Sequence, residues 1–420
     1  MRKIFLMRGA PGSGKDTLID QWGVRANTIG YDIARDLFGT TIHTFDGKTN
    51  SLTSRNQRLV AEMVKDAAEA RMHNGETLFV SNTNTSARDL KEWVKIAERH
   101  AYKVYAVNVQ GALSDADLLT RNANRPERDR VVESVILDMA NRYRTHKPTV
   151  QDVTYIIPSQ VPDLLTTETY DASEFDEVVV VGDIQGCGEA LNRLFDAIGS
   201  LDEKNRLWVF VGDLFDRGRT PVIVHDHLSR PRRNVVLVEG NHERSVRETM
   251  LGVRNYRASV QTVEDVVPHR GEKSLLNLIN RGRPFFPFTF AGKTRWVTHA
   301  GIDPAVLDGL IDGTTYQVGR VANRDFMIGT GTRGDGYRNI GTYNDFSERL
   351  DALTTASPLV DVQYFGHRND AYGTDPLDYT SIRPLDTEVE QGEVLTAVVI
   401  SKDGTERTVQ VAGEGERTRH

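Results

Sequence analysis

Residues 3–17, "KIFLMRGAPGSGKDT", decide the fold of the first part of the chain. A short apolar run leads into a glycine-rich loop, and "DTLIDQWG" continues with the pattern of a helix. Backbone N–H groups of such a loop can surround phosphate oxygens at the start of a helix, and a lysine adds positive charge. This order predicts an ATP site formed by Gly9, Gly12, Ser13, Gly14, Lys15, Asp16 and Thr17.

The segments after this loop alternate between strand and helix patterns. "LFV" (78–80) and "YKVYAVNV" (102–109) have the composition of buried strands. Between them, Leu90, Trp93 and Ala97 recur at helical spacing behind a capping box of Ser86 and Asp89. Strands that alternate with helices predict an α/β domain with a parallel, doubly wound sheet.

Two further segments of this region carry groups suited to phosphoryl transfer. In "GYDIARD" (30–36), Asp32 can accept a proton from an attacking hydroxyl, and Arg35 can bind a phosphate of the acceptor. In "TRNANRPERDR" (120–130), Arg121 and Arg125 suit a lid that neutralises a transferring phosphoryl group. Taken alone, the first segment also fits a surface salt bridge, and the second a solvated charged turn.

A second group of motifs follows further along the chain, each at the end of an apolar run. The runs are "VVVVGDIQG" (178–186), "LWVFVGDLFDRG" (207–218), "VVLVEGNHE" (235–243), "TRWVTHAG" (294–301) and "VQYFGHRN" (362–369). Carboxylate, amide and imidazole groups at the ends of strands can converge at one edge of a sheet, where they suit a two-metal site for phosphate esters. The candidate ligands are Asp183, Asp213, Asn241, His299 and His367.

Length and composition set the frame for these motifs. A chain of 420 residues predicts two or three domains, and 39% hydrophobic and 26% charged residues are typical of soluble globular proteins. No apolar run is long enough for a bilayer, no signal peptide is apparent, and the single cysteine, Cys187, excludes intramolecular disulfides. We therefore expect a cytoplasmic protein without membrane association.

Net charge and local composition bear on nucleic-acid binding and on domain boundaries. The net charge of −7 argues against general coating of nucleic acid but leaves local basic segments open, among them "RPRRN" (230–234). A change of texture near 146–176 predicts a first domain over 1–150, a linker over 151–175, a second domain over 176–412 and a tail over 413–420.

The first region resembles the kinase domain of the polynucleotide 5′-kinase/3′-phosphatase family. The resemblance covers about residues 1–145 and rests on "GAPGSGK", "YDIAR", "VSNTN" and "RNANR". It implies a general base at Asp32, an acceptor-phosphate clamp at Arg35, and donor-phosphate contacts from Lys15, Arg121 and Arg125. ATP and Mg²⁺ are the cofactors it implies.

Asp16 departs from this family, because the phosphate-loop pattern has Ser or Thr there to bind Mg²⁺. Asn82 departs as well, since family members often carry an aspartate at that strand end. One interpretation is that the two positions have exchanged their acidic group. The other is that Asp16 favours the helix dipole and Thr17 supplies the metal ligand.

The second region, about residues 176–400, resembles the binuclear metallophosphoesterase superfamily with its α/β sandwich. By this resemblance, Asp213 bridges two divalent metals, expected to be Mn²⁺, Asp183 holds the first, and Asn241, His299 and His367 hold the second. The resemblance also implies that His242 protonates the leaving oxygen and that Arg217 binds the phosphate. Gln185 stands where the superfamily usually has histidine, and its amide oxygen is a weaker metal ligand that the dinucleoside-tetraphosphatase branch tolerates.

Together the two resemblances predict a nucleic-acid end-healing enzyme. It would phosphorylate 5′-hydroxyl ends and remove 3′-phosphates or open 2′,3′-cyclic phosphates, on RNA in preference to DNA, with a separate ligase as partner and a homo-oligomer among the open alternatives. One rival is a small-molecule kinase fused to a dinucleoside polyphosphatase or protein phosphatase, which "GDIQGC" favours. The other is a nucleotide-dependent binding module with reduced catalysis, suggested by the substitutions at 16, 82 and 185.

Overall fold

The computed structural model describes residues 2–38, 40–44, 47–51, 54–126, 130–145, 149–329, 344–368 and 375–414. The chain forms two compact units, Met1–Thr166 and Thr167–His420. Each has its own sheets and its own buried core. The described helices include none with the length and apolar character needed to cross a membrane.

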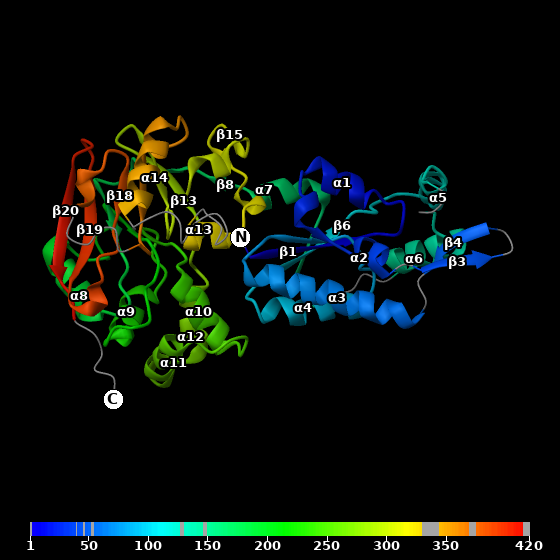
Figure 1. Ribbon diagram of the computed structural model, residues 1–420, viewed down its shortest axis with the longest axis horizontal. Helices are drawn as coiled ribbons and strands as arrows, with labels where there is room; N and C mark the ends of the chain where they lie inside the picture. Colours follow the sequence, from blue (N-terminus) through cyan, green and yellow to red (C-terminus); the bar gives the residue numbers. More distant parts are fainter. Residues whose placement is uncertain are drawn as a thin grey trace. The chain divides into compact units, whose positions relative to one another are not determined.

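The first unit is built around one parallel sheet, of which Figure 1 labels β1 and β6. Its strand order is β2-β5-β1-β6-β7. Its strands are β1 (Lys3–Arg8), β2 (Thr28–Ile29), β5 (Leu78–Val80), β6 (Lys103–Asn108) and β7 (Val153–Ile156). Ile4 and Leu6 of β1 pack into one apolar cluster, whereas Phe5 and Met7 pack into another. Alternate residues of a strand point to opposite faces, so both faces of this sheet are covered, as expected for a doubly wound domain.

Helices on the two faces and one hairpin complete the first unit. The longer helices are amphipathic, and α4 begins at the capping box of Ser86 and Asp89 that the sequence predicts. The elements are α1 (Lys15–Gln21), α2 (Tyr31–Phe38), α3 (Ser54–His73), α4 (Ala87–Glu98), α5 (Asp115–Ala123), α6 (Glu133–Thr145), α7 (Val161–Leu165), and the hairpin strands β3 (Thr40–Thr44) and β4 (Gly47–Ser51).

The second unit is a sandwich of two five-stranded sheets. One sheet has the order β12-β11-β10-β19-β20 and the other β18-β17-β14-β13-β9. Val178 and Val180 of the first sheet share an apolar cluster with Phe286 and Phe288 of the second, so the core lies between the sheets. The strands are β9 (Tyr170–Asp171), β10 (Glu177–Val181), β11 (Arg206–Phe210), β12 (Val235–Leu237), β13 (Phe286–Phe290), β14 (Lys293–Val297), β17 (Val362–Phe365), β18 (Ile382–Pro384), β19 (Val394–Ser401) and β20 (Glu406–Ala412).

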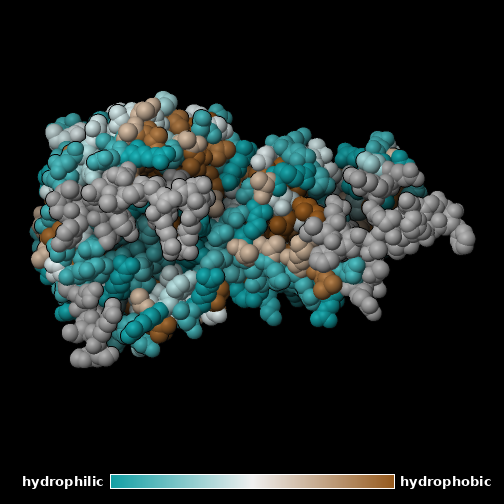
Figure 2. Space-filling model, viewed as in Figure 1, coloured by the Kyte–Doolittle hydropathy of each residue, from teal (hydrophilic) through white to brown (hydrophobic). Residues whose placement is uncertain are grey.

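Helices cover the outer faces of the sandwich. Leu191 and Leu194 of α8 pack with Val179 and Val181 of β10 on the outer face of the first sheet, and α14 packs on the second sheet. These elements are α8 (Gly188–Ile198), α9 (Pro221–Leu228), α10 (Asn241–Met250), α11 (Arg257–Arg270), α12 (Glu272–Ile279), α13 (Asn323–Ile328) and α14 (Asn344–Ala356), with a small sheet of β8 (Thr167–Glu168), β15 (Ile311–Asp312) and β16 (Thr315–Tyr316). The face seen in Figure 2 is mainly hydrophilic, with smaller apolar areas.

The segment 151–175, expected as a linker, carries ordered structure. Strand β7 pairs with β6 and α7 packs on the first unit, while β8 and β9 add strands to sheets of the second unit. The prolines and threonines of this segment are typical of a connection between domains. Its short strands, however, each pair with a strand of another segment: β7 with β6, β8 with β16, and β9 with β13.

Candidate active sites

The glycine-rich loop of the first unit joins β1 to α1. Gly12 and Gly14 have φ values of 86° and 94°, in the left-handed region that favours glycine. A Cβ atom added at Gly12 would lie 2.8 Å from the carbonyl oxygen of Leu118, so this position also has no room for a side chain. The loop therefore needs its glycines to bring the backbone to the start of α1, where phosphate binding is favoured.

Lys15 is buried at the first position of α1. Its Nζ donates hydrogen bonds to the carbonyl oxygens of Gly9 and Ala10, at 2.9 and 3.1 Å. The pKa of Lys15 is lowered to about 8, mainly by burial and also by the charge of Arg125, against the opposing charges of Asp16 and Asp32. Lys15 thus lies within electrostatic reach of the candidate base and of one lid arginine.

A cavity of 790 Å³ opens above this loop. Residues 12–17, from the loop and the first turn of α1, line it together with Arg121 and Arg125, and Val109 and Pro158 contribute apolar lining. Its volume suits a nucleotide. The structure therefore brings together the loop and the two lid arginines that the sequence placed at the donor phosphates.

Asp32 lies exposed in the first turn of α2. The backbone N–H of Tyr31 donates to Asn82 Oδ1 at 2.9 Å, so Asn82 fixes the start of the helix that carries Asp32. Asp16, also exposed, pairs with Arg25 at 3.4 Å. The side chain of Arg35 lies outside the described part of the chain.

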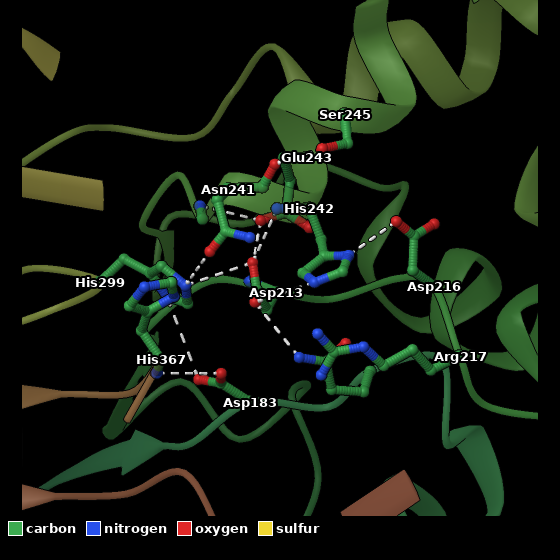
Figure 3. Close-up of polar contacts among 12 residues, drawn as sticks. Asp183, Asp213, Asp216, Arg217, Asn241, His242, Glu243, Ser245, His299 and His367 are labelled. Carbon is green, nitrogen blue, oxygen red and sulfur yellow. Dashed lines mark hydrogen bonds and ion pairs between the residues drawn. The ribbon is translucent and has the colours of Figure 1, made fainter. Parts of the chain in front are cut away.

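In the second unit, the candidate metal ligands converge at one edge of the sandwich (Figure 3). Asp213 lies at the centre: its Oδ1 is 3.2 Å from His299 Nε2, and its Oδ2 accepts from Gln185 Nε2 at 3.2 Å. His299 Nε2 also lies 3.1 Å from Asn241 Oδ1, and the rings of His299 and His367 have centroids 5.1 Å apart. Strand ends from both sheets thus supply one cluster.

This cluster fits divalent metals. One ligand atom from each of Asp213, His299 and His367 can lie within 4.8 Å of the others. Asp183 Oδ1 and Gln185 Oε1 are buried and have no hydrogen-bond partner among the described residues, which is costly unless a cation satisfies them. Carboxylate, amide and imidazole donors together suit Mn²⁺ and similar ions.

The electrostatics of the cluster agree with this fit. Burial raises the pKa of Asp183, and the neighbouring carboxylates of Asp386 and Asp213 raise it further. Burial also lowers the pKa of His367, to about 3, and the charge of His299 adds to the effect. A bound cation would offset the repulsion among the carboxylates and would favour the neutral imidazole needed for coordination.

His242 is paired with a second carboxylate, that of Asp216. His242 Nδ1 lies 2.7 Å from Asp216 Oδ2, and the hydroxyls of Ser259 and Thr262 on α11 donate to the same carboxylate at 2.7 and 2.6 Å. Burial alone would lower the pKa of His242, but Asp213 and Asp216 raise it to about 9. The imidazole is therefore held in one orientation, in which Nδ1 contacts Asp216 and Nε2 takes no part in that contact.

Arg217 is about half exposed, and its Nη1 donates to the buried Glu390 at 3.0 Å. Burial opposes its charge, but Glu390 raises the pKa of Arg217 overall.

The backbone of the metal cluster and its neighbours is strained, because several residues other than glycine have positive φ. These residues are Gln185, Asp213, Asp216, Arg217 and His367, with φ values from 46° to 73°.

Comparison with known proteins assigns both units. Residues 4–146 match the family model described as an AAA domain, and residues 177–368 match the model described as calcineurin-like phosphoesterase. The chain joins a P-loop kinase-like domain to a calcineurin-like metallophosphoesterase domain. The α/β fold class predicted for both parts is thereby confirmed, and the two domains imply nucleotide binding and divalent metals, respectively.

Solved structures similar to this chain include two phosphatases and a kinase. A proposed diadenosine tetraphosphatase is 19% identical, with 59% of this chain and 98% of that chain covered and a TM-score of 0.39. A protein serine/threonine phosphatase from Saccharomyces cerevisiae is 13% identical, with coverages of 64% and 92% and a TM-score of 0.41. A gluconokinase from Sinorhizobium meliloti is 13% identical, with coverages of 38% and 84% and a TM-score of 0.25.

Sequence reasoning missed the role of Glu243 in the phosphoesterase domain. Its buried carboxylate accepts hydrogen bonds from the backbone N–H groups of Asp213 and Leu214, both at 2.8 Å, and of Gly240 at 2.9 Å. It therefore holds the loop after β11 against the start of α10. Its place directly after Asn241 and His242 was the available signal.

The C-terminal segment of the phosphoesterase domain was also missed. Glu414 Oε1 accepts from the backbone N–H of Glu189 at 2.6 Å and from Thr220 Oγ1 at 2.8 Å. The carboxylate thus lies at the start of α8, where the helix dipole favours negative charge. The loop before α8 carries Gln185, and the loop before Thr220 carries Arg217.

Proposed function

We propose that this protein heals nucleic-acid ends. The P-loop domain would transfer the γ-phosphate of ATP to a 5′-hydroxyl, and the phosphoesterase domain would remove a 3′-phosphate or open a 2′,3′-cyclic phosphate. The observation that carries the proposal is the grouping of Lys15, Arg121 and Arg125 around one cavity, with the carboxylate of Asp32 within electrostatic reach. That grouping suits phosphoryl transfer to a hydroxyl.

In the kinase reaction, each group acts through charge or proton transfer. Lys15 exchanges its two carbonyl partners in the loop for phosphate oxygens, and Arg121 and Arg125 neutralise the transferring group. Asp32 orients the attacking hydroxyl and takes its proton. Arg35 is proposed to bind the phosphate next to that hydroxyl, and Mg²⁺ to accompany ATP.

In the phosphatase reaction, the metals would be held by six residues and would supply Lewis-acid polarisation of the phosphate ester. Arg217 binds the phosphate oxygens, exchanging its contact with Glu390 for them. His242 donates its Nε2 proton to the leaving oxygen while Asp216 keeps Nδ1 protonated. The six residues are Asp183, Gln185, Asp213, Asn241, His299 and His367.

We further propose RNA ends as the substrate and the cytoplasm as the location, with a separate ligase sealing the healed ends. The RNA substrate and the separate ligase follow from the resemblance of "YDIAR" and "RNANR" to end-healing kinases. The location rests on the single cysteine, Cys187, which suits a reducing compartment. Mn²⁺ is the proposed phosphatase metal.

A second candidate function is a small-molecule kinase joined to a dinucleoside polyphosphatase. Gln185 favours it, because an amide replaces the usual imidazole beside Asp183.

One experiment separates end healing from this second function. The full chain is incubated with Mn²⁺ and either a 5′-hydroxyl, 3′-phosphate RNA or a dinucleoside tetraphosphate, with and without ATP, and both RNA ends are followed. We expect loss of the 3′-phosphate without ATP and gain of a 5′-phosphate with it. Hydrolysis of the dinucleotide with both RNA ends unchanged would refute end healing.

A further inference from the structure

A second cavity of the phosphoesterase domain, of 490 Å³, lies away from the metal ligands. Its lining comes from the three connections that lead into β10, β11 and β12, at 174–175, 201–204 and 230–234. The metal ligands of the same sheet follow these strands at their other ends. A strand of five residues spans about 16 Å, so the cavity is distinct from the active site.

The charge of this cavity is positive. Lys204, Arg230, Arg232 and Arg233 line it, opposed by Glu174 and Asp202. Arg232 pairs with Asp202 at 3.2 Å, whereas Arg233 and Glu174, both well exposed, pair at 3.3 Å, so that pair contributes little. Among the described residues, Lys204 and Arg230 have no acidic partner within ion-pair distance.

A neighbouring arginine adds to the positive charge around this cavity. Arg281 is partly buried, and its Nη1 donates to the carbonyl oxygens of Leu228 and Ser229, just before the 230–234 segment. Burial lowers the pKa of Arg281, and the charge of Arg232 lowers it further. Five cationic side chains therefore gather around this cavity, in a protein whose net charge is −7.

The cavity is also a fixed structure with an apolar side. The buried Asn234 donates from Nδ2 to the carbonyl oxygens of Leu201, Glu203 and Arg206, at 3.1, 3.0 and 3.0 Å, and so ties two of the connections together. Phe175 and Leu201 are buried in the lining, and Pro231 is exposed beside them. Cationic groups around an apolar surface suit a nucleotide, whose phosphate is anionic and whose base is flat and apolar on its faces.

We infer that this cavity binds one nucleotide of a single-stranded nucleic acid whose end is processed elsewhere on the protein. Lys204 and Arg230 contact backbone phosphates, and the base lies against the exposed Pro231, beside the buried Phe175 and Leu201. This inference rests on the proposed function, because it takes nucleic acid as the substrate class.

Binding of a labelled 12-nucleotide RNA with 3′-hydroxyl ends tests it, because that strand has no phosphate to release. The probe is titrated with the full chain at several salt concentrations and followed by fluorescence anisotropy. In the double variant Lys204→Gln/Arg230→Gln, loss of two phosphate contacts should reduce the slope of log Kd against log salt by about 1.4, which corresponds to about 25-fold weaker binding at 0.1 M salt. Arg407→Gln, an exposed arginine on β20 at the opposite edge of the sheet, is the matched control.

Unchanged Kd and slope in the double variant, or an equal loss in the control, would overturn the inference. Inorganic phosphate, titrated by calorimetry, should bind wild type and double variant alike. A phosphate site lost in the double variant would overturn the assignment to a strand.

Activity on RNA ends is measured in parallel. If neither end reacts but the double variant binds RNA more weakly, the proposed function fails, whereas the binding of a single strand in this cavity stands. If both ends react and the variant binds as wild type does, the inference fails alone.

Discussion

Asp216→Asn should shift the pH dependence of the phosphatase reaction. The carboxylate of Asp216 is buried and faces three donors: His242 Nδ1 and the hydroxyls of Ser259 and Thr262. An asparagine of the same shape keeps one oxygen but loses the negative charge beside the imidazole. Protonated His242 then has a weaker partner, while neutral His242 is less affected.

The size of the shift follows from this contact. A hydrogen bond to a charged group contributes about 1.5–3 kcal/mol, and one pKa unit equals about 1.36 kcal/mol. Losing it should therefore lower the pKa of His242 by about 1–2 units from the value of about 9 that Asp213 and Asp216 together maintain. Because the general acid must be protonated, the alkaline limit of activity should move to lower pH by the same amount.

The assay is kcat/KM for 3′-phosphate release across the pH range, with the kinase activity of the same chain as a check on folding. Thr262→Val is the matched control. It removes a hydroxyl that donates to Asp216 and leaves the carboxylate a better acceptor for His242, so its alkaline limit should not fall. An Asp216→Asn enzyme with the alkaline limit of the wild type would refute the assignment of His242 as an acid tuned by Asp216.

Three substitutions and one binding measurement test the remaining assignments. Asp32→Asn should abolish 5′-phosphorylation and leave 3′-phosphate release intact, Asp213→Ala should do the reverse, and loss of both activities in either folded variant would contradict two separate sites. Gln185→His should lower the Mn²⁺ concentration needed for half-maximal phosphatase activity, since imidazole is the better ligand, and an unchanged requirement would mean that residue 185 is no ligand. Burial lowers the pKa of Lys15 to about 8, so protonation of Lys15 should accompany nucleotide binding above about pH 8 and binding should weaken as pH rises; calorimetry in buffers of different ionisation enthalpy would show the proton uptake, and its absence would argue against a contact of Lys15 with phosphate.

The sequence was informative where a functional group follows an apolar run. Asp183 and Asp213 could be named because each ends such a run, and parallel strands bring their ends to one edge of a sheet. His299 also ends such a run, but its strand β14 belongs to the second sheet. Partners from other segments gave no such signal. Ser259 lies on a helix whose pattern shows only its packing face, and Glu390 lies in a short 3-10 helix (Val389–Gln391) after the last parallel strand. Their contacts depend on the packing of distant segments, which spacing along the chain does not reveal.

The loop residue Asp16 shows the same limit in the P-loop domain. The sequence left open whether it exchanges roles with Asn82 or serves the helix dipole. The structure gives each residue a local partner, Arg25 for Asp16 and the backbone of Tyr31 for Asn82. Both contacts are made by segments about ten or more residues away, and the motif itself does not encode them.

The carboxylate of Glu414 bears on where the phosphoesterase domain can be cut from the chain. A fragment over 176–412, the boundaries that composition suggests, would lack this acceptor at the start of α8 and would also lack β8 and β9. Loss of a helix-capping group typically costs about 0.5–2 kcal/mol. Loss of β9 would in addition expose an edge of the sheet that contains β13. An isolated domain that begins at Thr167 and extends past Glu414 keeps both features. In a shorter fragment, a loss of activity would reflect the lower stability of the fold and not the catalytic residues.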